Sequence, residues 1–387
     1  MRIVVAPDSF KESMTAATAA AAMADGVRAV LPHAECILTP LADGGEGTTE
    51  ALLAALGGQW QDATVRDPLG RPVAARYGIT DDGTAIIEAA EAIGLGRLSP
   101  RERNPMRATS LGLADLIRDA LDHGATRLLI GLGGTATIDG GAGLLAGLGA
   151  RWLDRDGHQL EPRPDHLGAA HRVDLTGLDP RLPSTAIDLA CDVTNPLLGE
   201  EGAAAVYGPQ KGATPEQVIL LDATLERIAD ALVHAGRPEA RHLAGAGAAG
   251  GLGAALLALG AIPRPGIDVV AEAVGLERAI AEADLVLTGE GSIDAQTLRG
   301  KTLAGVARIA AAAGVPVIAL AGRIQPDADA LLDAGLAAIV PICPAPVSLE
   351  AALKSGQDNL GSATATALRL WLLGLQRRTR HDKAALD

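Results

Sequence analysis

MRIVVAPDSFKES (residues 1–13) opens the chain with a short apolar run that ends in a polar turn. The run Ile3–Ala6 predicts a buried β-strand, and Asp8 begins the turn behind it. The same pattern, a β-rich run followed by a turn with Gly or Asp, recurs at Cys36–Thr39, Leu128–Gly131, Leu285–Thr288, Pro316–Ala319 and Ala338–Pro341. Ala/Leu segments of helical period alternate with such runs. This alternation is typical of βαβ units and predicts an α/β fold with a mostly parallel sheet.

The middle of the chain has a different pattern. Between about residues 60 and 90, TVRDPLGRPVAARYGI, a DDG turn and TAIIEAA predict an antiparallel meander. Helical patterns follow near residues 214–235 and 268–283, and strand–helix alternation returns after Asp284. We therefore expect a parallel-sheet domain formed by both chain ends (residues 1–58 and 265–387) and an inserted second α/β domain (residues 59–264) that contains a mixed sheet.

Length and composition limit the classes of function. At roughly 150 residues per domain, 387 residues are enough for two or three domains. The chain is 48% apolar, which excludes disorder for most of its length. Its net charge of −14 and its six aromatic residues argue against a nucleic-acid or anionic-membrane surface, and they favour a small-molecule partner.

The sequence shows no sign of export or of a structural metal cluster. Cys36, Cys191 and Cys343 lie far apart, a spacing that favours neither a disulfide framework nor a zinc knuckle. The first residues lack the features of a signal peptide. The uncharged stretch Leu243–Ile262 is rich in Gly and Ala and is too weakly hydrophobic for a membrane span. We expect a cytoplasmic location.

Lysine is rare in this chain, with five lysines against 28 arginines. Three of the five lie in polar motifs: Lys11 in APDSFKES, Lys211 in YGPQKGA and Lys301 in LRGKT. A compact ammonium group can follow a moving phosphoryl oxygen, whereas a guanidinium group is planar and presents its donors in a rigid arrangement. The placement indicates phosphate chemistry, although chance clustering is left open for each lysine taken alone.

Two neighbouring strands are each expected to end in a polar turn. In PLADGGEGT (residues 40–48), Asp43 and Glu46 flank a Gly-Gly turn, and two carboxylates at this spacing could hold Mg²⁺. The alternative is a simple strand-to-helix turn in which Asp43 or Thr48 caps the helix. The turn after the first strand contains Asp8, Ser9 and Lys11. We expect both turns at the same edge of one sheet.

A glycine-rich loop follows the strand that ends near residue 131. The segment GLGGTATIDGGAG (residues 131–143) offers successive backbone N–H groups that could hold a phosphate. It is not a Walker A sequence, and Gly300-Lys301-Thr302 has Ala295 where that motif needs Gly, so a P-loop NTPase is excluded. GAGAAG (residues 245–250) matches a dinucleotide-binding pattern but follows no predicted strand, which makes a dehydrogenase a distant second enzyme class.

Two further strand ends carry carboxylates. In IDLACDVTNPLLG (residues 187–199), Asp192 could accept a proton from an alcohol, or it could form an Asx-turn that only closes the loop. In LVLTGEGSIDAQT (residues 285–297), Glu290 and Asp294 could bind Mg²⁺ or position Lys301, and Asp294 could instead cap the next helix. Neither a Ser-His arrangement nor an H-E-x-x-H motif occurs, so hydrolases of those types are disfavoured.

Taken together, these motifs resemble the bacterial type I glycerate kinases over nearly the whole chain. The resembling blocks, in order, are residues 6–13, 40–48, 131–143, 190–199, 207–213, 245–253 and 287–302. The resemblance implies a Rossmann-like domain interrupted by the second α/β domain. It also implies ATP- and Mg²⁺-dependent phosphorylation of D-glycerate, at the 2-hydroxyl.

The resemblance and the residue chemistry together suggest roles for the motifs. The expected phosphate-binding backbone of the nucleotide site comprises Gly133, Gly134, Thr135, Gly247, Gly250 and Gly251. The expected contacts to substrate or to the transferred group are Lys11, Asp8, Ser9, Lys211, Asn195 and Lys301. Asp192 is the expected general base with Asp43 as the second candidate. Metal ligands are expected among Asp43, Glu46, Glu290 and Asp294. This distribution predicts an active site in a cleft between the two domains.

Three positions differ from the family pattern. Glu12 replaces Gly after the first Lys, Ile138 replaces Asn in the glycine-rich loop, and Ser292 replaces a basic residue after Gly-Glu-Gly. Two other functions remain open: a kinase of another small hydroxy acid or sugar, and a non-catalytic nucleotide-binding regulator. We expect nucleotide and glycerate as partners and neither nucleic acid nor membrane, while a homo-oligomer is left open.

Overall fold

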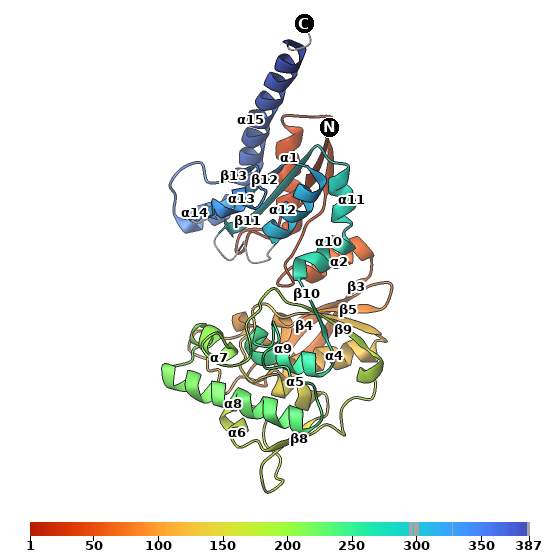
Figure 1. The fold of residues 1–387 in the computed structure, drawn as a ribbon, viewed down its shortest axis with the longest axis vertical. Helices are drawn as coiled ribbons and strands as arrows, with labels where there is room; N and C mark the ends of the chain where they lie inside the picture. Colours follow the sequence, from red (N-terminus) through yellow and green to blue (C-terminus); the bar gives the residue numbers. More distant parts are fainter. Residues whose placement is uncertain (294–296, 298–301, 327, 385–387) are drawn as a thin grey trace. The chain divides into compact units, whose positions relative to one another are not determined.

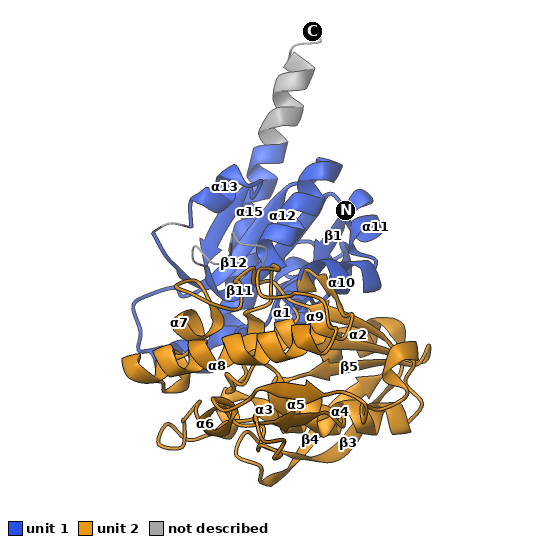
Figure 2. Ribbon diagram, turned by 60° about the horizontal axis from the view of Figure 1, so that its bottom comes forward, with its two compact units in different colours: residues 1–43, 267–387 blue, residues 44–266 orange. Residues whose placement is uncertain are grey.

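The computed structural model describes the whole chain except residues 294–296, 298–301, 327 and 385–387 (Figure 1). The chain forms two compact units: unit 1 is Met1–Asp43 with Ile267–Asp387, and unit 2 is Gly44–Gly266 (Figure 2). The boundaries expected from the sequence were 58/59 and 264/265. Helix α2 (Thr48–Leu56) falls in unit 2, where it contacts two of that unit's strands.

Unit 1 is built on a five-stranded, fully parallel sheet. Its strands are β1 (Arg2–Val5), β2 (Glu35–Leu38), β11 (Leu285–Ile293), β12 (Val317–Ile324) and β13 (Ala338–Pro341). The spatial order is β13-β12-β11-β1-β2, which in chain order is the doubly wound arrangement 2-1-3-4-5. In such sheets the strand order reverses between the first and third strands, and ligands bind beyond the carboxyl ends there. The switch point of this sheet lies between β1 and β11.

Helices cover unit 1 on both faces of its sheet. Helix α1 (Ala16–Arg28) starts at the cap Thr15 and packs against α15 (Gly356–Ala384) over the side chains of Ile3, Val5, Leu285 and Leu287. The two helices approach closely, since a Cβ at Gly26 would lie 2.4 Å from the carbonyl of Gly361. On the other side, α12 (Thr302–Ala313) contacts β11 and β12. The remaining helices are α10 (Gly266–Ala273), α11 (Leu276–Ala281), α13 (Ala330–Asp333) and α14 (Leu349–Lys354).

Two details of unit 1 differ from the sequence-based expectation. The single helical pattern near 268–283 is two helices, α10 and α11, because Gly275 adopts a left-handed conformation (φ 64°) between them. Strand β11 runs on to Ile293, so Glu290 lies inside a strand and not in the turn after it.

Unit 2 contains a mixed sheet, as predicted, and this sheet has six strands. Its strands are β3 (Gln59–Arg66), β4 (Pro72–Ile79), β5 (Thr84–Glu88), β6 (Arg127–Gly131), β9 (Ala186–Ala190) and β10 (Ile262–Arg264). The order is β10-β9-β6-β5-β4-β3. The first four of these are mutually parallel, while β5, β4 and β3 form the predicted antiparallel meander.

The helices of unit 2 bring small-residue segments into close contact. They are α3 (Ala90–Ile93), α4 (Leu111–Asp122), α5 (Ala142–Gly147), α6 (Pro164–Leu167), α7 (Ala203–Tyr207), α8 (Pro215–His234) and α9 (Ala248–Ala258), with a hairpin of β7 (Arg151–Leu153) and β8 (Arg172–Asp174) and the 3₁₀ turns η1 (Leu95–Arg97), η2 (Leu182–Ser184) and η3 (Pro209–Lys211). A Cβ at Gly141 would lie 2.4 Å from the Cβ of Ala255. The Gly/Ala segments of α5 and α9 therefore pack on each other.

Within the described part of the chain, no helix combines the length and the apolar character that crossing a membrane requires. Residues 248–258 of the Gly/Ala stretch form α9, whose side chains are mostly buried inside unit 2.

Candidate active site

In unit 1, two carboxylates lie at the switch point of the sheet. Asp8 directly extends β1, since its amide donates to the carbonyl of Gly289 in β11 at 2.8 Å. Its Oδ2 accepts from the Thr302 hydroxyl at 2.5 Å, and its Oδ1 accepts from the Ser9 amide at 2.6 Å. Glu290 is buried in β11, and its Oε1 accepts from the Thr297 hydroxyl at 2.6 Å.

The environment of Asp8 favours a cation. Burial and, to a smaller extent, the nearby carboxylate of Asp43 together raise the pKa of Asp8 to about 6, while the hydrogen bonds from Thr302 and Ser9 and the Lys11 ammonium act in the opposite direction. The carboxylates of Asp8 and Asp43 repel each other, and such a pair fits a divalent cation, which would remove the repulsion. Asp294 and Lys301, both expected in this site, lie outside the described residues.

Two departures from the family pattern have a local explanation in unit 1. Glu12 has φ 64°, a left-handed conformation that Gly adopts without strain, so the backbone here keeps the shape that Gly would favour. Ser292 is paired in register with Arg323 of β12. An exposed guanidinium group therefore lies one strand away from the position where the family pattern has a basic residue.

In unit 2, the ends of the parallel strands β6 and β9 meet the turn that precedes α2. The turn that carries Glu46 lies against the start of the glycine-rich loop, since a Cβ at Gly131 would be 2.1 Å from the carbonyl of Gly44. A Cβ at Gly44 would in turn be 2.9 Å from that of Ala190, at the end of β9. The absence of side chains on these glycines lets the three backbones approach.

Glu88, at the end of β5, is not among the residues expected from the sequence, yet it binds the turn that carries Glu46. Its carboxylate accepts from the amide of Thr49 at 2.9 Å in the first turn of α2, whose N-cap Gly47 is left-handed and has no side chain to offer. Burial raises the pKa of Glu88. The Thr48 hydroxyl donates to the carbonyl of Gly45 at 2.8 Å, so Thr48 is the first helical residue and not the cap. Glu88 thus holds the Asp43–Thr48 turn on the sheet.

The glycine-rich loop is anchored along its length. The carbonyl of Gly134 accepts from the amide of Leu95 at 2.8 Å, and the amide of Ala136 donates to the carbonyl of Ile93 at 2.8 Å. Fully buried Asp139 accepts from both the amide (2.7 Å) and the hydroxyl (2.8 Å) of Ser110, and from the amide of Gly143 at 3.1 Å. Burial raises the pKa of Asp139. Asp139 therefore acts as a structural clamp of the loop.

The second glycine-rich segment packs on the first. A Cβ at Gly250 would lie 1.9 Å from the carbonyl oxygen of Thr137, and one at Gly247 would lie 2.2 Å from that of Pro196. Residues 249–251 all have positive φ, including Ala249 at 52°. A run of left-handed residues, one of them not Gly, is the kind of strain that is concentrated at functional sites.

Three side chains of unit 2 that are expected in the active site form hydrogen bonds with other residues of the protein. The buried Nζ of Lys211 donates to Thr135 Oγ1 at 3.2 Å and to the carbonyl of Thr137 at 2.9 Å. Asn195 accepts from the Tyr207 hydroxyl at 2.7 Å and donates to the carbonyl of Glu201 at 2.8 Å. The Oδ1 of Asp192 accepts from the amide of Gly266 at 2.8 Å.

Ile138 faces away from the site. It is fully buried in a cluster with Leu197, Leu221 and Leu225. A polar side chain at this position would be buried among apolar ones, so the Ile of this chain suits the core.

The predicted residues that the structure describes thus lie in two groups, one in each unit. Unit 1 holds Asp8, Ser9, Lys11, Asp43 and Glu290. Unit 2 holds Glu46, Gly133, Gly134, Thr135, Asp192, Asn195, Lys211, Gly247, Gly250 and Gly251.

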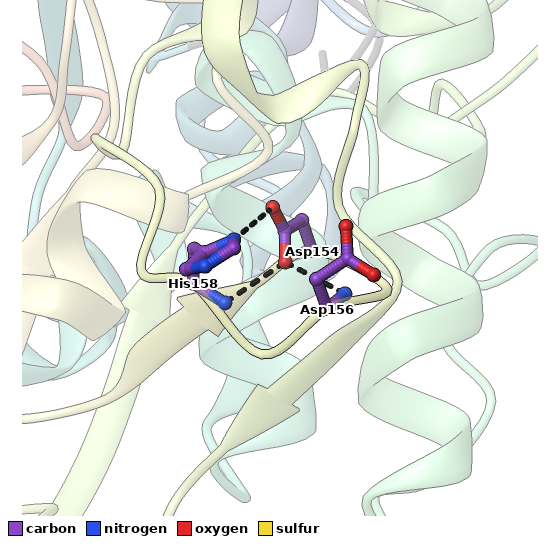
Figure 3. Close-up of side chains that lie close together, drawn as sticks. All are labelled: Asp154, Asp156 and His158. Atoms are coloured by element: carbon purple, nitrogen blue, oxygen red, sulfur yellow. Dashed lines mark hydrogen bonds and ion pairs between the residues drawn. The ribbon is translucent and has the colours of Figure 1, made fainter.

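A separate acidic group lies in the loop after β7 (Figure 3). Asp154 accepts from the amides of Asp156 at 2.9 Å and His158 at 2.8 Å, and the His158 ring lies 3.3 Å from its Oδ2. These contacts close an exposed turn, and they account for the proximity of the three side chains.

Comparison with known proteins identifies full-length relatives. The sequence profile of the Glycerate kinase family matches residues 3–372. The glycerate kinase of Bacillus subtilis (strain 168) is 47% identical over 93% of this chain and 95% of its own length. The glycerate 2-kinase of Escherichia coli (strain K12) is 42% identical over 97% of this chain and 99% of its own length. A crystal structure of a putative glycerate kinase 2 from Salmonella typhimurium LT2 is 45% identical and superimposes with a TM-score of 0.86, covering 97% of this chain and 99% of that one.

Proposed function

Because the chain belongs to the glycerate kinase family, we propose that it transfers the γ-phosphoryl group of ATP to the 2-hydroxyl of D-glycerate, giving 2-phosphoglycerate. The observation that carries the proposal is the packing of the 131–143 loop against both the 44–47 turn and residues 245–251. That packing brings the backbones of these three segments together next to the carboxyl ends of β6 and β9, with Glu46 in the turn and Lys211 bound to the loop.

We assign the nucleotide phosphates to backbone amides of unit 2. Phosphoryl transfer needs little covalent help, and catalysis consists mainly of positioning and of neutralising the phosphate oxygens. Gly133, Gly134, Thr135, Gly247, Gly250 and Gly251 would supply the N–H groups. The glycines in contact with neighbouring backbone, such as Gly250 against Thr137, could not be replaced without separating the loops.

Acidic residues suit a magnesium ion. Carboxylate oxygens are the ligands that Mg²⁺ prefers, and the mutual repulsion of Asp8 and Asp43 fits such an ion. The residues that would hold it are Asp43, Glu46, Glu290 and Asp294, with Asp8 beside Asp43. The ion, when bound, would neutralise negative charge on the phosphates. Lys11, Ser9 and Lys301 would add donors to the transferred group.

Asp192 remains our candidate for the general base. The hydrogen bond from the Gly266 amide to its Oδ1 fixes the orientation of the carboxylate. Asp43 is the second candidate. The hydrogen bonds of Asn195 to Tyr207 and Glu201 suit a residue that shapes the loop beside this carboxylate.

The reaction requires the phosphoryl donor and the hydroxyl at one place. Lys11 and Asp8 belong to unit 1, while Asp192 and the phosphate loop belong to unit 2. We therefore propose that residues of both units act on the same bound substrates, with water excluded during transfer. ATP as co-substrate agrees with a cytoplasmic location, which we also propose.

Phosphorus NMR tests the function directly. Incubation of the protein with ATP, Mg²⁺ and D-glycerate is expected to yield ADP and 2-phosphoglycerate, with Asp192→Asn as the control for contaminating kinases. Formation of 3-phosphoglycerate would overturn the assigned position. Turnover of a different hydroxy acid or sugar, but not of glycerate, would overturn the substrate. Binding of ATP with no turnover of any acceptor would indicate a regulator.

A further inference from the structure

Lys211 has an unusual position for a lysine of a phosphate site. It ends the 3₁₀ turn η3, and its side chain is only 4% exposed. Two of its three ammonium hydrogens are used by the protein itself, on Thr135 Oγ1 and on the carbonyl of Thr137. Both acceptors belong to the 131–143 loop, so this ammonium group is bound to the loop that is proposed to hold the nucleotide.

The surroundings of the ammonium group are mostly uncharged. Asp139 is the acidic side chain whose charge acts on it, and the Tyr207 ring centroid lies 6.0 Å from Nζ. Burial lowers the pKa of Lys211 to about 7. Burying an ammonium group costs free energy unless hydrogen bonds compensate, and Thr135 and Thr137 supply such bonds here.

The same carbonyl joins the two glycine-rich segments. The oxygen of Thr137 accepts from Lys211 and also contacts the Cα region of Gly250, where a Cβ would come within 1.9 Å of it. The amide of Gly140 donates to the carbonyl of Gly250 at 3.0 Å. Lys211 is therefore attached at the point where the 131–143 loop meets residues 245–251.

We propose that Lys211 is a positioning residue, whose hydrogen bonds to Thr135 and Thr137 hold the loop so that the amides of Gly133–Thr135 face the nucleotide phosphates. This inference rests on the proposed nucleotide site. It assigns Lys211 an action through the loop, in contrast to a direct contact between its ammonium and a phosphate oxygen.

A double-mutant cycle separates the two roles. Lys211→Met removes the donors and Thr135→Val removes one acceptor, while Lys354→Met removes an exposed lysine from α14 as a matched control. If Lys211 acts through the loop, each single variant is expected to raise the KM for ATP about 10-fold, and the double variant is expected to be little worse than Lys211→Met alone. The KM for glycerate should stay within about twofold. If the double variant instead multiplies the two single-variant increases in the KM for ATP, the proposal is overturned and a direct phosphate contact is indicated.

A conservative variant distinguishes positioning from charge. Lys211→Gln keeps an N–H donor and removes the charge, so a positioning role predicts partial recovery of the KM for ATP relative to Lys211→Met. Equal losses in the two variants would contradict the proposal. If Lys211→Met does not fold, as judged by thermal unfolding, Thr135→Val and Lys211→Gln still carry the test.

The binding of ADP, measured by calorimetry, keeps this inference separate from the proposed reaction. Wild-type protein that binds ADP without phosphorylating glycerate would refute the proposed function, and the same cycle on the Kd of ADP would still test Lys211. Suppose instead that glycerate turnover is normal and that the double variant multiplies the two single-variant increases in the Kd of ADP. This result would refute the role of Lys211 and leave the proposed function in place.

Discussion

Asp8 is a residue whose ionised form the fold disfavours. Its pKa of about 6 exceeds the ordinary value of 3.8, because burial and Asp43 disfavour the ionised form. The folded state thus binds the Asp8 proton more tightly than the unfolded state. The resulting contribution to stability is present below pH 3.8 and is lost as the pH rises through 6. At neutral pH, ionised Asp8 costs the fold about 3 kcal/mol.

Replacement of Asp8 should reveal that cost. At pH 8 and without Mg²⁺, Asp8→Asn is expected to raise the free energy of unfolding by about 1–3 kcal/mol, since the buried charge is removed. The gain in the free energy of unfolding should be smaller at pH 5. The same substitution should lower kcat. Urea denaturation at the two pH values measures the first effect. The exposed control Asp81→Asn should show no such pH-dependent gain, and a destabilised Asp8→Asn at pH 8 would contradict this account of the site.

Asp192 gives a prediction about chemistry alone. Asn at this position keeps an oxygen that can accept from the Gly266 amide, so the local structure should survive. It removes the negative charge, and a lost general base lowers the rate by about 10²-fold or more. We therefore expect Asp192→Asn to reduce kcat by that factor with the Kd for ATP unchanged, as measured by steady-state kinetics and calorimetry. Near-normal turnover would exclude Asp192 as the base.

At the element scale, the strands were predictable because their signal is local. The apolar run Ala338–Pro341 matches β13 residue for residue, and the other five predicted strands are present with shifted ends. The start of α2 was not predictable in the same way. The amide of Thr49 in its first turn donates to Glu88, which lies 39 residues away in the chain. The two residues become neighbours only when β5 joins the sheet.

Loss of the Glu88 acceptor should disturb the turn before α2. Glu88→Ala is expected to destabilise the protein by about 1 kcal/mol, the typical cost of a lost helix cap, and to raise the KM for ATP. Glu88→Gln keeps an acceptor oxygen, so its stability and its KM for ATP should be closer to those of the wild type. Thermal unfolding and kinetics check both, with Glu50→Ala, an exposed change on α2, as the control. Equal behaviour of Glu88→Ala and Glu50→Ala would show that Glu88 has no such role.

The register of β11 and β12 leads to another prediction. Arg323 lies beside Ser292, and a guanidinium group is well suited to a carboxylate such as that of glycerate. Arg323→Met is expected to raise the KM for glycerate about 10-fold or more, the scale of a lost charged hydrogen bond, with little change in the KM for ATP. Arg308→Met on α12 removes an exposed arginine as the control. An unchanged KM for glycerate would mean that another group binds the carboxylate.

At the scale of the whole molecule, the proposed chemistry involves two units connected near residues 43/44 and 266/267. If residues of both act on the same substrates, binding should draw them together. Small-angle scattering of Asp192→Asn, which should bind without turnover, is expected to show a smaller radius of gyration with ATP, Mg²⁺ and D-glycerate than without them. ATP alone serves as the comparison. An unchanged radius with both substrates would argue against closure.

The strand–helix alternation, the mixed sheet and the identity of the polar turns could be predicted from the sequence, because hydrophobic periodicity and the positions of Gly and Asp act over a few residues. The folded structure was needed to establish that Lys211 is bound to the 131–143 loop, that Ile138 faces the core and that Glu88 binds the first turn of α2. Those outcomes depend on contacts between segments far apart in the chain. Such contacts follow from how the sheets are ordered, and no local pattern encodes that order.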